Sequence, residues 1–181
     1  VNDCGAKTII SSEDKIEALA DIRKHTQIEN IISFGKQENG IKSFHSLVAE
    51  NLSIERELNV SAKDLSTIAY TSGTTGHPKG AMQSHEAVIL NGSMMSQLHM
   101  RGSDDIVVSA LPCPHVYANV LMTGMMMFGT KLVLHKTFEV EAIFEAIKIH
   151  KATIFDGVPT MYMFMLNSST LEKSDLSSLK R

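Results

Sequence analysis

Eleven residues decide the fold of this chain: Tyr70-Thr71-Ser72-Gly73-Thr74-Thr75-Gly76-His77-Pro78-Lys79-Gly80. Glycine lacks a Cβ atom, so its backbone N–H group can approach an anion closely. The threonine and serine hydroxyls add hydrogen-bond donors, and the lysine adds a compact positive charge. The stretch therefore predicts a loop that binds phosphate.

Two other interpretations of this loop are weaker. The Walker loop needs Gly, four residues and then Gly-Lys-Ser/Thr, whereas Lys79 follows Gly76 by three positions and precedes a glycine. Clusters of Ser, Thr and Gly also occur in ordinary surface loops with solvated lysines. However, the apolar residues 65–70 read as a strand that leads into the loop, and this context favours phosphate binding.

The loop resembles the signature loop of the AMP-forming adenylating enzymes, the superfamily of acyl-CoA synthetases, firefly luciferase and peptide-synthetase adenylation domains. Shorter stretches extend the likeness over nearly the whole chain, namely residues 3–7 (Asp-Cys-Gly-Ala-Lys), 84–85 (Ser-His), 111–115 (Leu-Pro-Cys-Pro-His) and 157–160 (Gly-Val-Pro-Thr). Within the superfamily the chain is most similar to long-chain fatty acid–CoA ligases. The resemblance implies part of the large N-terminal domain of an acyl-CoA synthetase-like fold.

The resemblance also implies a two-step reaction. A carboxylate attacks the α-phosphate of ATP to give an acyl-adenylate and pyrophosphate, and the thiol of coenzyme A then takes the acyl group. Preorganised donors and a lysine would stabilise the charge on the departing pyrophosphate. Mg²⁺ would accompany ATP with few protein ligands, so no dedicated metal site is expected. Lys79 is the expected catalytic residue, and the expected ATP-binding residues are Thr71, Ser72, Gly73, Thr74, Thr75, Gly76 and Lys79.

The expected substrate is a small-molecule carboxylic acid, fatty-acyl or related. Peptide-synthetase adenylation domains place an aspartate in the turn after the loop to pair with an amino group, whereas residues 112–117 here read Pro-Cys-Pro-His-Val-Tyr. His115 is expected either to contact the carboxylate or gate the acyl site, or to pack against the core. Pro159 and Thr160 stand where the family borders its acyl pocket, so they are candidate substrate residues.

The methionines after the phosphate loop have two interpretations. Thioether side chains fill irregular space, so they suit an adaptable lipid tunnel as well as an ordinary core. Core filling is the default expectation. The residues concerned are Met94, Met95, Met122, Met125, Met126, Met127, Met161, Met163 and Met165.

The family's later motifs, including its adenine-binding, ribose-binding and C-terminal lysine segments, have no match in these residues. The chain is therefore expected to be a fragment of one larger domain, with residues 1–64 as a first α/β segment with a linker and residues 65–181 as the phosphate-loop segment. Alone it is expected to be inactive. The alternative is a non-catalytic binding or assembly module that keeps the fold. Apolar surface left uncovered predicts self-association.

Composition excludes several other classes of protein. With 43% hydrophobic and 20% charged residues, the 181-residue chain is typical of a globular protein. A net charge of −3 without a basic cluster argues against nucleic-acid partners. Residues 120–134, the longest apolar run, are too few to span a bilayer, so no integral membrane segment is expected. Cys4 and Cys113 form no CxxC pair, which fits a reducing cytoplasm.

Apolar strand-like runs alternate with amphipathic ones, which predicts an α/β fold of layered sheets with crossover helices. Ser12 and Ser84 are the expected helix N-caps, and Asp104 and Asp105 are expected to be capping groups. Strands are expected at residues 7–11, 30–34, 65–70, 106–110, 131–135 and 153–156, and helices at 13–25, 44–50, 85–98, 117–128, 140–150 and 158–166. In the first helix the expected inward residues are Ile16, Leu19, Ala20 and Ile22.

Overall fold

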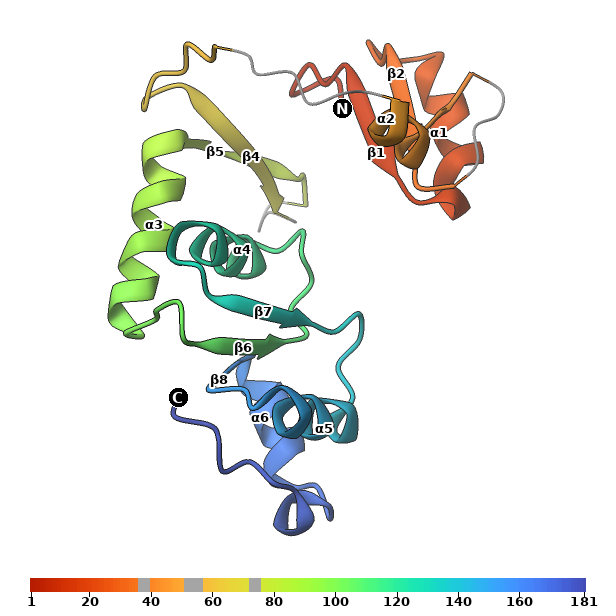
Figure 1. The fold of residues 1–181 in the computed structure, drawn as a ribbon. Helices are drawn as coiled ribbons and strands as arrows, with labels where there is room; N and C mark the ends of the chain where they lie inside the picture. Colours follow the sequence, from red (N-terminus) through yellow and green to blue (C-terminus); the bar gives the residue numbers. More distant parts are fainter. Residues whose placement is uncertain (36–39, 51–56, 72–75) are drawn as a thin grey trace. The chain divides into compact units, whose positions relative to one another are not determined.

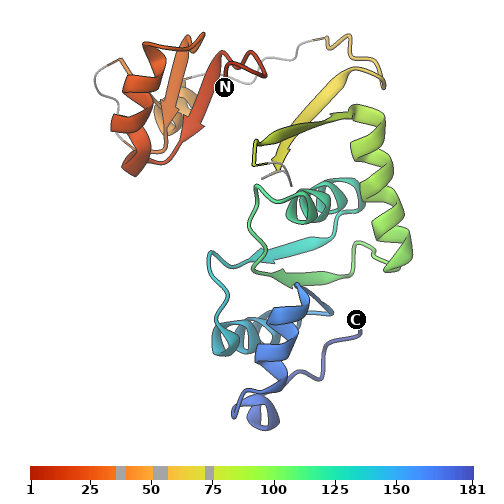
Figure 2. The ribbon, with the colours of Figure 1, turned by 180° about the vertical axis from the view of Figure 1, so that it is seen from behind.

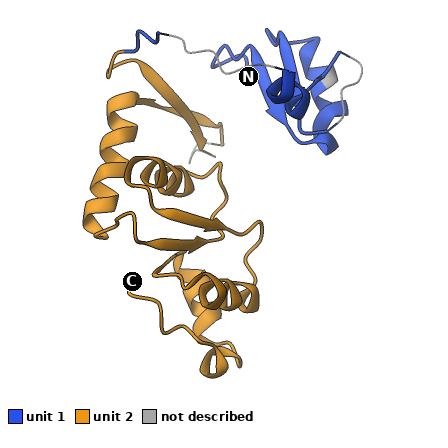
Figure 3. Cartoon of the chain, in the orientation of Figure 1, with its two compact units in different colours: residues 1–60 blue, residues 61–181 orange. Residues whose placement is uncertain are grey.

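The chain forms two compact units, which Figures 1 and 3 show. The computed structural model describes residues 1–35, 40–50, 57–71 and 76–181. The first unit comprises Val1–Val60 and the second Ser61–Arg181. Each unit contains parallel strands connected by helices, so the predicted α/β class is confirmed.

The first unit is built on a small parallel sheet with the strand order β1-β2-β3. Its core consists of Ile28, Ile31 and Ile41, all buried. Helices follow the first and third strands. The elements are β1 (Thr8–Ser11), η1 (Glu13–Lys15), α1 (Ile16–Arg23), β2 (Asn30–Ser33), β3 (Lys42–Ser43) and α2 (Phe44–Glu50).

The first predicted helix starts differently from the expectation. Ser12 has extended backbone, but its side chain makes no capping hydrogen bond. Instead the backbone N–H of Lys15 donates to the Ser12 carbonyl over 3.3 Å and closes a 3₁₀ turn, η1. The α-helix therefore begins only at Ile16, and the predicted Ser12 cap is wrong.

The inward face of α1 is shorter than predicted. Ile16 and Leu19 pack against the isoleucine core as expected. Ile22 is 38% exposed, so its predicted inward position is wrong. The described contacts of α1 with this core come from Ile16 and Leu19. The side chain of Ala20 lies outside the described residues.

The second unit begins with an antiparallel hairpin and a long helix. The strands β4 (Leu65–Thr71) and β5 (Lys79–Ser84) pair along their length. β4 was predicted, whereas β5 was not, because its sequence Lys-Gly-Ala-Met-Gln-Ser contains no β-branched or aromatic residue. Ser84 ends β5 and caps α3 (His85–Leu98), and its Oγ accepts a hydrogen bond from the N–H of Ala87 over 3.2 Å. This predicted cap is confirmed.

The rest of the second unit is a parallel sheet with the order β7-β6-β8 and helices between the strands. In Figures 1 and 2, α4 and α5 lie on opposite sides of these strands. Predicted and observed bounds agree to within one residue at each end. The elements are β6 (Ile106–Ser109), α4 (Val116–Phe128), β7 (Lys131–Leu134), α5 (Val140–His150), β8 (Ile154–Asp156), α6 (Pro159–Leu166) and η2 (Leu171–Lys173).

The apolar core of the second unit follows the alternation of side chains along β6. Val108 belongs to a buried cluster with Ile143 and Ile147 of α5, as the amphipathic pattern of that helix predicts. Val107 instead lines a small space with Leu121 of α4. Successive residues of a strand point to opposite faces, so β6 contributes to the packing of both helix layers.

A close contact between α3 and α4 depends on glycine. A Cβ atom at Gly92 would lie 2.9 Å from Cγ2 of Thr123, and one at Gly124 would lie 3.1 Å from Oγ of Ser96. Distances this short force neighbouring atoms to shift, so the two glycines permit the close approach of the helices. Among the described helices, none has the length and apolar character required to cross a bilayer.

The acidic pair at residues 104–105 was predicted to cap, but no described helix begins there. Asp105 instead closes a turn by accepting from the N–H of Gly102 over 3.1 Å. It also accepts from Oγ1 of Thr153 over 2.7 Å and contacts Nη2 of Arg181 with both carboxylate oxygens at 2.9 Å. Burial acts to raise the pKa of Asp105, but these hydrogen bonds and the Arg181 charge together lower it.

Core filling is the wrong interpretation for several methionines. Met94, Met126 and Met163 are 67%, 78% and 61% exposed, whereas Met165 is buried at 7%. The exposed ones lie on α3, α4 and α6. Leu98 lies beside Met94 on α3, around an open hollow of about 590 Å³. The lipid-tunnel interpretation stays a prediction.

Candidate functional site

The predicted phosphate loop connects the two strands of the hairpin. Thr71 is the last residue of β4 and pairs with Lys79, the first residue of β5. Both are exposed. Four of the predicted ligand residues lie outside the described residues: Ser72, Gly73, Thr74 and Thr75. The hairpin brings the two ends of the loop together, so a hydroxyl and an amine come from adjacent strand ends.

Gly76 has a backbone conformation that favours glycine. Its φ angle is +82°, in the region that residues with a Cβ atom rarely adopt. No heavy atom lies within 4 Å of the position a Cβ atom would take, so the space beside this backbone is open. Gly76 thus borders open space and Lys79 is exposed, as a ligand-binding role would require.

His115 lies at the start of α4 as its N-cap residue. Its Nδ1 accepts a hydrogen bond from the N–H of Tyr117 over 3.2 Å, and the residue is exposed. The alternative in which it packs against the core is therefore wrong. An imidazole that already accepts through Nδ1 leaves Nε2 as the nitrogen available to a substrate.

A hollow lies between the hairpin and the start of α4. It has a volume of about 280 Å³. The hairpin contributes Thr67, Ile68, Ala69, Tyr70 and Gln83, and the turn and first residues of α4 contribute Pro114, Val116 and Asn119. Tyr70, which comes just before the end of β4, and the two neighbours of His115, Pro114 and Val116, thus border one mostly apolar space.

The other two predicted substrate residues begin α6. Pro159 is in the first turn of the helix, where its missing N–H costs no hydrogen bond, and both Pro159 and Thr160 are exposed. On either side of this pair, Val158 and Met161 pack on the cluster formed by Leu111, Ala118, Leu121 and Tyr117. The starts of α4 and α6 are therefore linked through a shared apolar cluster.

Arg101, Asp156 and Tyr117 are polar residues that contact one another and were not singled out from the sequence. Nη2 of Arg101 lies 2.8 Å from Oδ1 and 2.7 Å from Oδ2 of Asp156, and both side chains are about 5% exposed or less. The hydroxyl of Tyr117 donates to Oδ1 of Asp156 over 3.1 Å. Burial, with the nearby Asp156 carboxylate, raises the pKa of Tyr117 to about 12. The sequence feature that could have indicated this group is Asp156, a carboxylate within the otherwise apolar run at residues 152–158.

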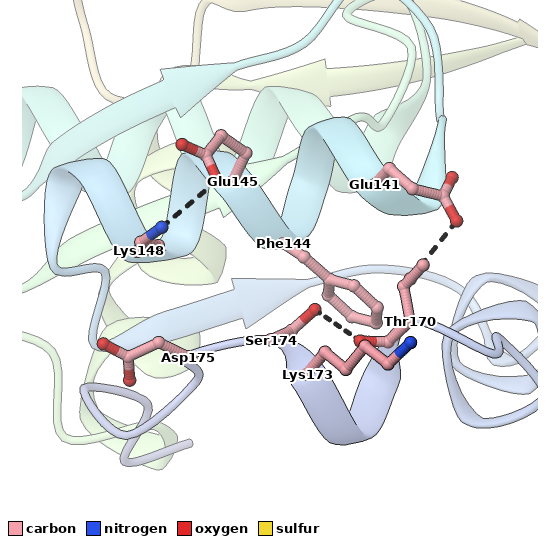
Figure 4. A pocket seen from close by; sticks show the side chains of 8 residues that line it. All are labelled: Glu141, Phe144, Glu145, Lys148, Thr170, Lys173, Ser174 and Asp175. Atoms are coloured by element: carbon pink, nitrogen blue, oxygen red, sulfur yellow. Dashed lines mark hydrogen bonds and ion pairs between the residues drawn. The ribbon is translucent and has the colours of Figure 1, made fainter.

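A separate pocket lies between α5 and residues 170–175, and Figure 4 shows it. Its lining carries charges of both signs, and none of the predicted site residues belongs to it. The lining residues are Glu141, Phe144, Glu145, Lys148, Thr170, Lys173, Ser174 and Asp175. Within the described ranges, no group of three or more His, Cys, Asp or Glu side chains could hold a metal ion.

Comparison with known proteins identifies the family of the chain. The AMP-binding enzyme model matches residues 1–181. The indoleacetate–CoA ligase of Aromatoleum aromaticum is 32% identical over 166 residues, which cover 91% of this chain and 31% of the ligase. The 4-coumarate–CoA ligase 5 of Oryza sativa subsp. japonica is 32% identical over 158 residues, which cover 83% of this chain and 29% of that ligase. The chain thus spans about a third of the length of these relatives.

Solved structures show the same fold. The long-chain-fatty-acid–CoA ligase FadD1 of Archaeoglobus fulgidus superimposes with a TM-score of 0.85 at 26% identity, covering 99% of this chain and 36% of that one. The ATP-bound MatB of Rhodopseudomonas palustris superimposes with a TM-score of 0.84 at 26% identity, covering 98% of this chain and 35% of that one. The predicted acyl-CoA synthetase-like fold, represented here by part of it, is confirmed.

Proposed function

Because the chain belongs to the AMP-binding enzyme family, we propose that it is the phosphate-binding part of an ATP-dependent acid–thiol ligase. In this reaction a carboxylate attacks the α-phosphate of ATP, the bond to pyrophosphate breaks, and coenzyme A then displaces AMP from the acyl-adenylate. The observation that carries the proposal is the hairpin end, where Gly76 has a positive φ angle beside open space and Lys79 is exposed.

The roles of the loop residues follow from the charge that develops during the first step. Negative charge moves onto the departing pyrophosphate, and fixed N–H and hydroxyl donors stabilise it without reorganising. Thr71 and Gly76 offer such donors, and Lys79 offers a positive charge from the first position of β5. Ser72, Gly73, Thr74 and Thr75 complete the proposed ATP-binding set. Mg²⁺ would enter bound to ATP, since it keeps its waters and needs few protein ligands.

The proposed substrate is a fatty-acyl or related carboxylic acid. The hollow between the hairpin and α4 offers an apolar wall, and the turn before α4 carries no carboxylate that would pair with an amino group. His115, Pro159 and Thr160 are the proposed acid-side residues. A long-chain-fatty-acid–CoA ligase of Bacillus subtilis is 32% identical over 120 residues, covering 65% of this chain and 21% of that ligase. The cytoplasm is the proposed location, since Cys4 and Cys113 are free thiols.

The 181-residue chain by itself is proposed to be unable to complete adenylation, since it spans only about a third of its relatives. It is also proposed to self-associate through apolar helix faces, of which the face of α3 with Met94 and Leu98 is an example. A measurable carboxylate-dependent exchange of pyrophosphate into ATP by this chain would contradict the first proposal. If the full-length gene product also lacks exchange, the non-catalytic module is favoured instead.

The decisive test is binding of MgATP, measured by titration calorimetry on wild type, Lys79→Ala and Lys131→Ala. Lys131 is the matched control, because it is also exposed and also opens a strand. We expect Lys79→Ala to weaken binding on the order of 10-fold, the effect of about 1.4 kcal/mol, and Lys131→Ala to leave it unchanged. Equal affinities in all three proteins would overturn the proposed phosphate site.

A further inference from the structure

The buried group formed by Arg101, Asp156 and Tyr117 connects three parts of the second unit. Arg101 follows α3, Tyr117 lies in the first turn of α4, and Asp156 is the last residue of β8. The backbone of Asp156 is also held, since its carbonyl accepts from Oγ of Ser109 over 2.8 Å. One carboxylate therefore determines how the start of α4 lies against the end of β8.

This group lies next to the residues proposed for the acid. The N–H of Tyr117 donates to Nδ1 of His115, so the position of Tyr117 sets the position of the imidazole. On the other side, Asp156 is three residues before Pro159, and Tyr117 packs in the cluster that holds Val158. The same hydrogen bond thus constrains the acid-side residues of both helices.

Stability alone is a poor explanation for such a group. Burying two charges costs free energy that their attraction only partly offsets, and apolar replacements of buried ion pairs are often neutral or stabilising. The second unit contains another aspartate–arginine contact, between the buried Asp105 and the more exposed Arg181, next to the amino end of β6. That contact closes a turn and lies at the other end of the sheet strands from Asp156, so it provides an internal comparison.

We propose that Arg101, Asp156 and Tyr117 form a positioning network that sets the geometry of the acid-binding side of the site. Arg101 neutralises the carboxylate, Asp156 directs the hydroxyl of Tyr117, and Tyr117 holds the backbone that orients His115. None of the three touches the reacting atoms. The inference rests on the proposed function for its substrate, but its geometric part concerns this chain alone.

The geometric part is tested by NMR of the His115 ring in the chain labelled at histidine. Tyr117→Phe removes the hydroxyl and keeps the aromatic ring, and we expect the ring signals of His115 to shift. Tyr162→Phe is the matched control, because the Tyr162 hydroxyl donates to the carbonyl of Phe155 and not to the carboxylate. Unchanged His115 signals in Tyr117→Phe, or equal shifts in both variants, would overturn the network.

The functional part is tested by steady-state kinetics of the full-length gene product. We expect Tyr117→Phe and Asp156→Asn to raise KM for the acid on the order of 10-fold, as for the loss of one hydrogen bond to a charged group, with KM for ATP changed less than about twofold. Asp105→Asn, the control for a buried aspartate, is expected to lower the melting temperature without altering the ratio of the two KM values.

The outcomes separate this inference from the proposed function. A shift of His115 together with a selective rise in KM for the acid supports the network. Equal changes in both KM values, or a selective change in Asp105→Asn, overturn it. A full-length protein without ligase activity refutes the proposed function, while the NMR result still decides the geometry. If Asp156→Asn does not fold, Tyr117→Phe carries both measurements.

Discussion

Thr71 and Lys79 form the terminal pair of the β4–β5 ladder, one at the end of each strand. Their pairing places a hydroxyl and an ammonium group together where the chain reverses direction. An antiparallel partner holds the backbone of Lys79 in place, so only its side chain has to be ordered when a ligand binds. A free surface loop would have to order first.

Replacing Lys79 with alanine is expected to slow adenylate formation by the full-length protein roughly 10 to 1000-fold, because one preorganised charge contact is lost. Pyrophosphate exchange measures this step. Circular dichroism is expected to show an unchanged fold, since Lys79 is exposed. A rate within twofold of wild type, with Lys131→Ala as the reference, would contradict the assigned role.

Gly76→Ala tests the backbone conformation of the loop. At a φ angle of +82° a Cβ atom costs about 1 kcal/mol, although the surrounding space is open. Gly102→Ala is the control, because its Cβ would also meet open space but its φ angle lies outside the positive region. We expect weaker MgATP binding only in Gly76→Ala, and equal effects of the two variants would refute the requirement.

The acid stability of the chain is expected to depend on Asp105. Its pKa is lower in the folded state than its ordinary value of 3.8, so the folded state binds fewer protons than the unfolded state. Its contribution is therefore present above pH 3.8 and lost as the pH falls through the lowered folded pKa. Urea unfolding between pH 2 and 5 is expected to show a shallower acid limb in Asp105→Asn. An identical limb would contradict this.

The ionisation of Tyr117 reports directly on its carboxylate partner. Its folded pKa of about 12 lies above the ordinary 10.0, so the stability that it contributes is present below pH 10 and lost as the pH rises towards 12. In Asp156→Asn the carboxylate charge is gone, and we expect the pKa of Tyr117 to fall. Carbon-13 NMR of labelled tyrosine measures it, and an unchanged titration would exclude a direct contact.

Self-association is expected to depend on the exposed face of α3. Leu98 is 77% exposed beside Met94, and a lysine at position 98 would place a charge in any apolar interface there. Light scattering is expected to show oligomers for wild type and fewer for Leu98→Lys. Val48→Lys, at an exposed position of α2, is the control. A monomer at every concentration of wild type would contradict the proposal.

The sequence predicted most of the second unit because its elements have strong local signals. Ser84 is a recognisable cap, and the 3.6-residue pattern of α5 puts Ile143 and Ile147 on one face, where both are buried. β5 escaped because its strand is held by pairing with β4 and not by its own composition. The contact of Arg101 with Asp156 joins residues 55 apart, and no local pattern encodes such a distant pair.

The residues of the candidate site also differ in how far the sequence could predict them. The proposed roles of Lys79 and Gly76 rest on the distinctive order of residues along the chain, whereas the hydrogen bond from Tyr117 to Asp156 depends on how α4 packs against β8. His115 was singled out from its place in the turn, but only the structure shows that it caps α4. Residue types at short spacing were therefore predictable, and orientations set by tertiary packing were not.

Ser84 belongs to two elements at once, as the last residue of β5 and the cap of α3, with no linker between them. Any displacement of the strand that begins with Lys79 must therefore pull on the first turn of the helix. Because of this junction α3 moves with the hairpin, so a fluorescent probe attached to that helix would report ligand binding at the loop.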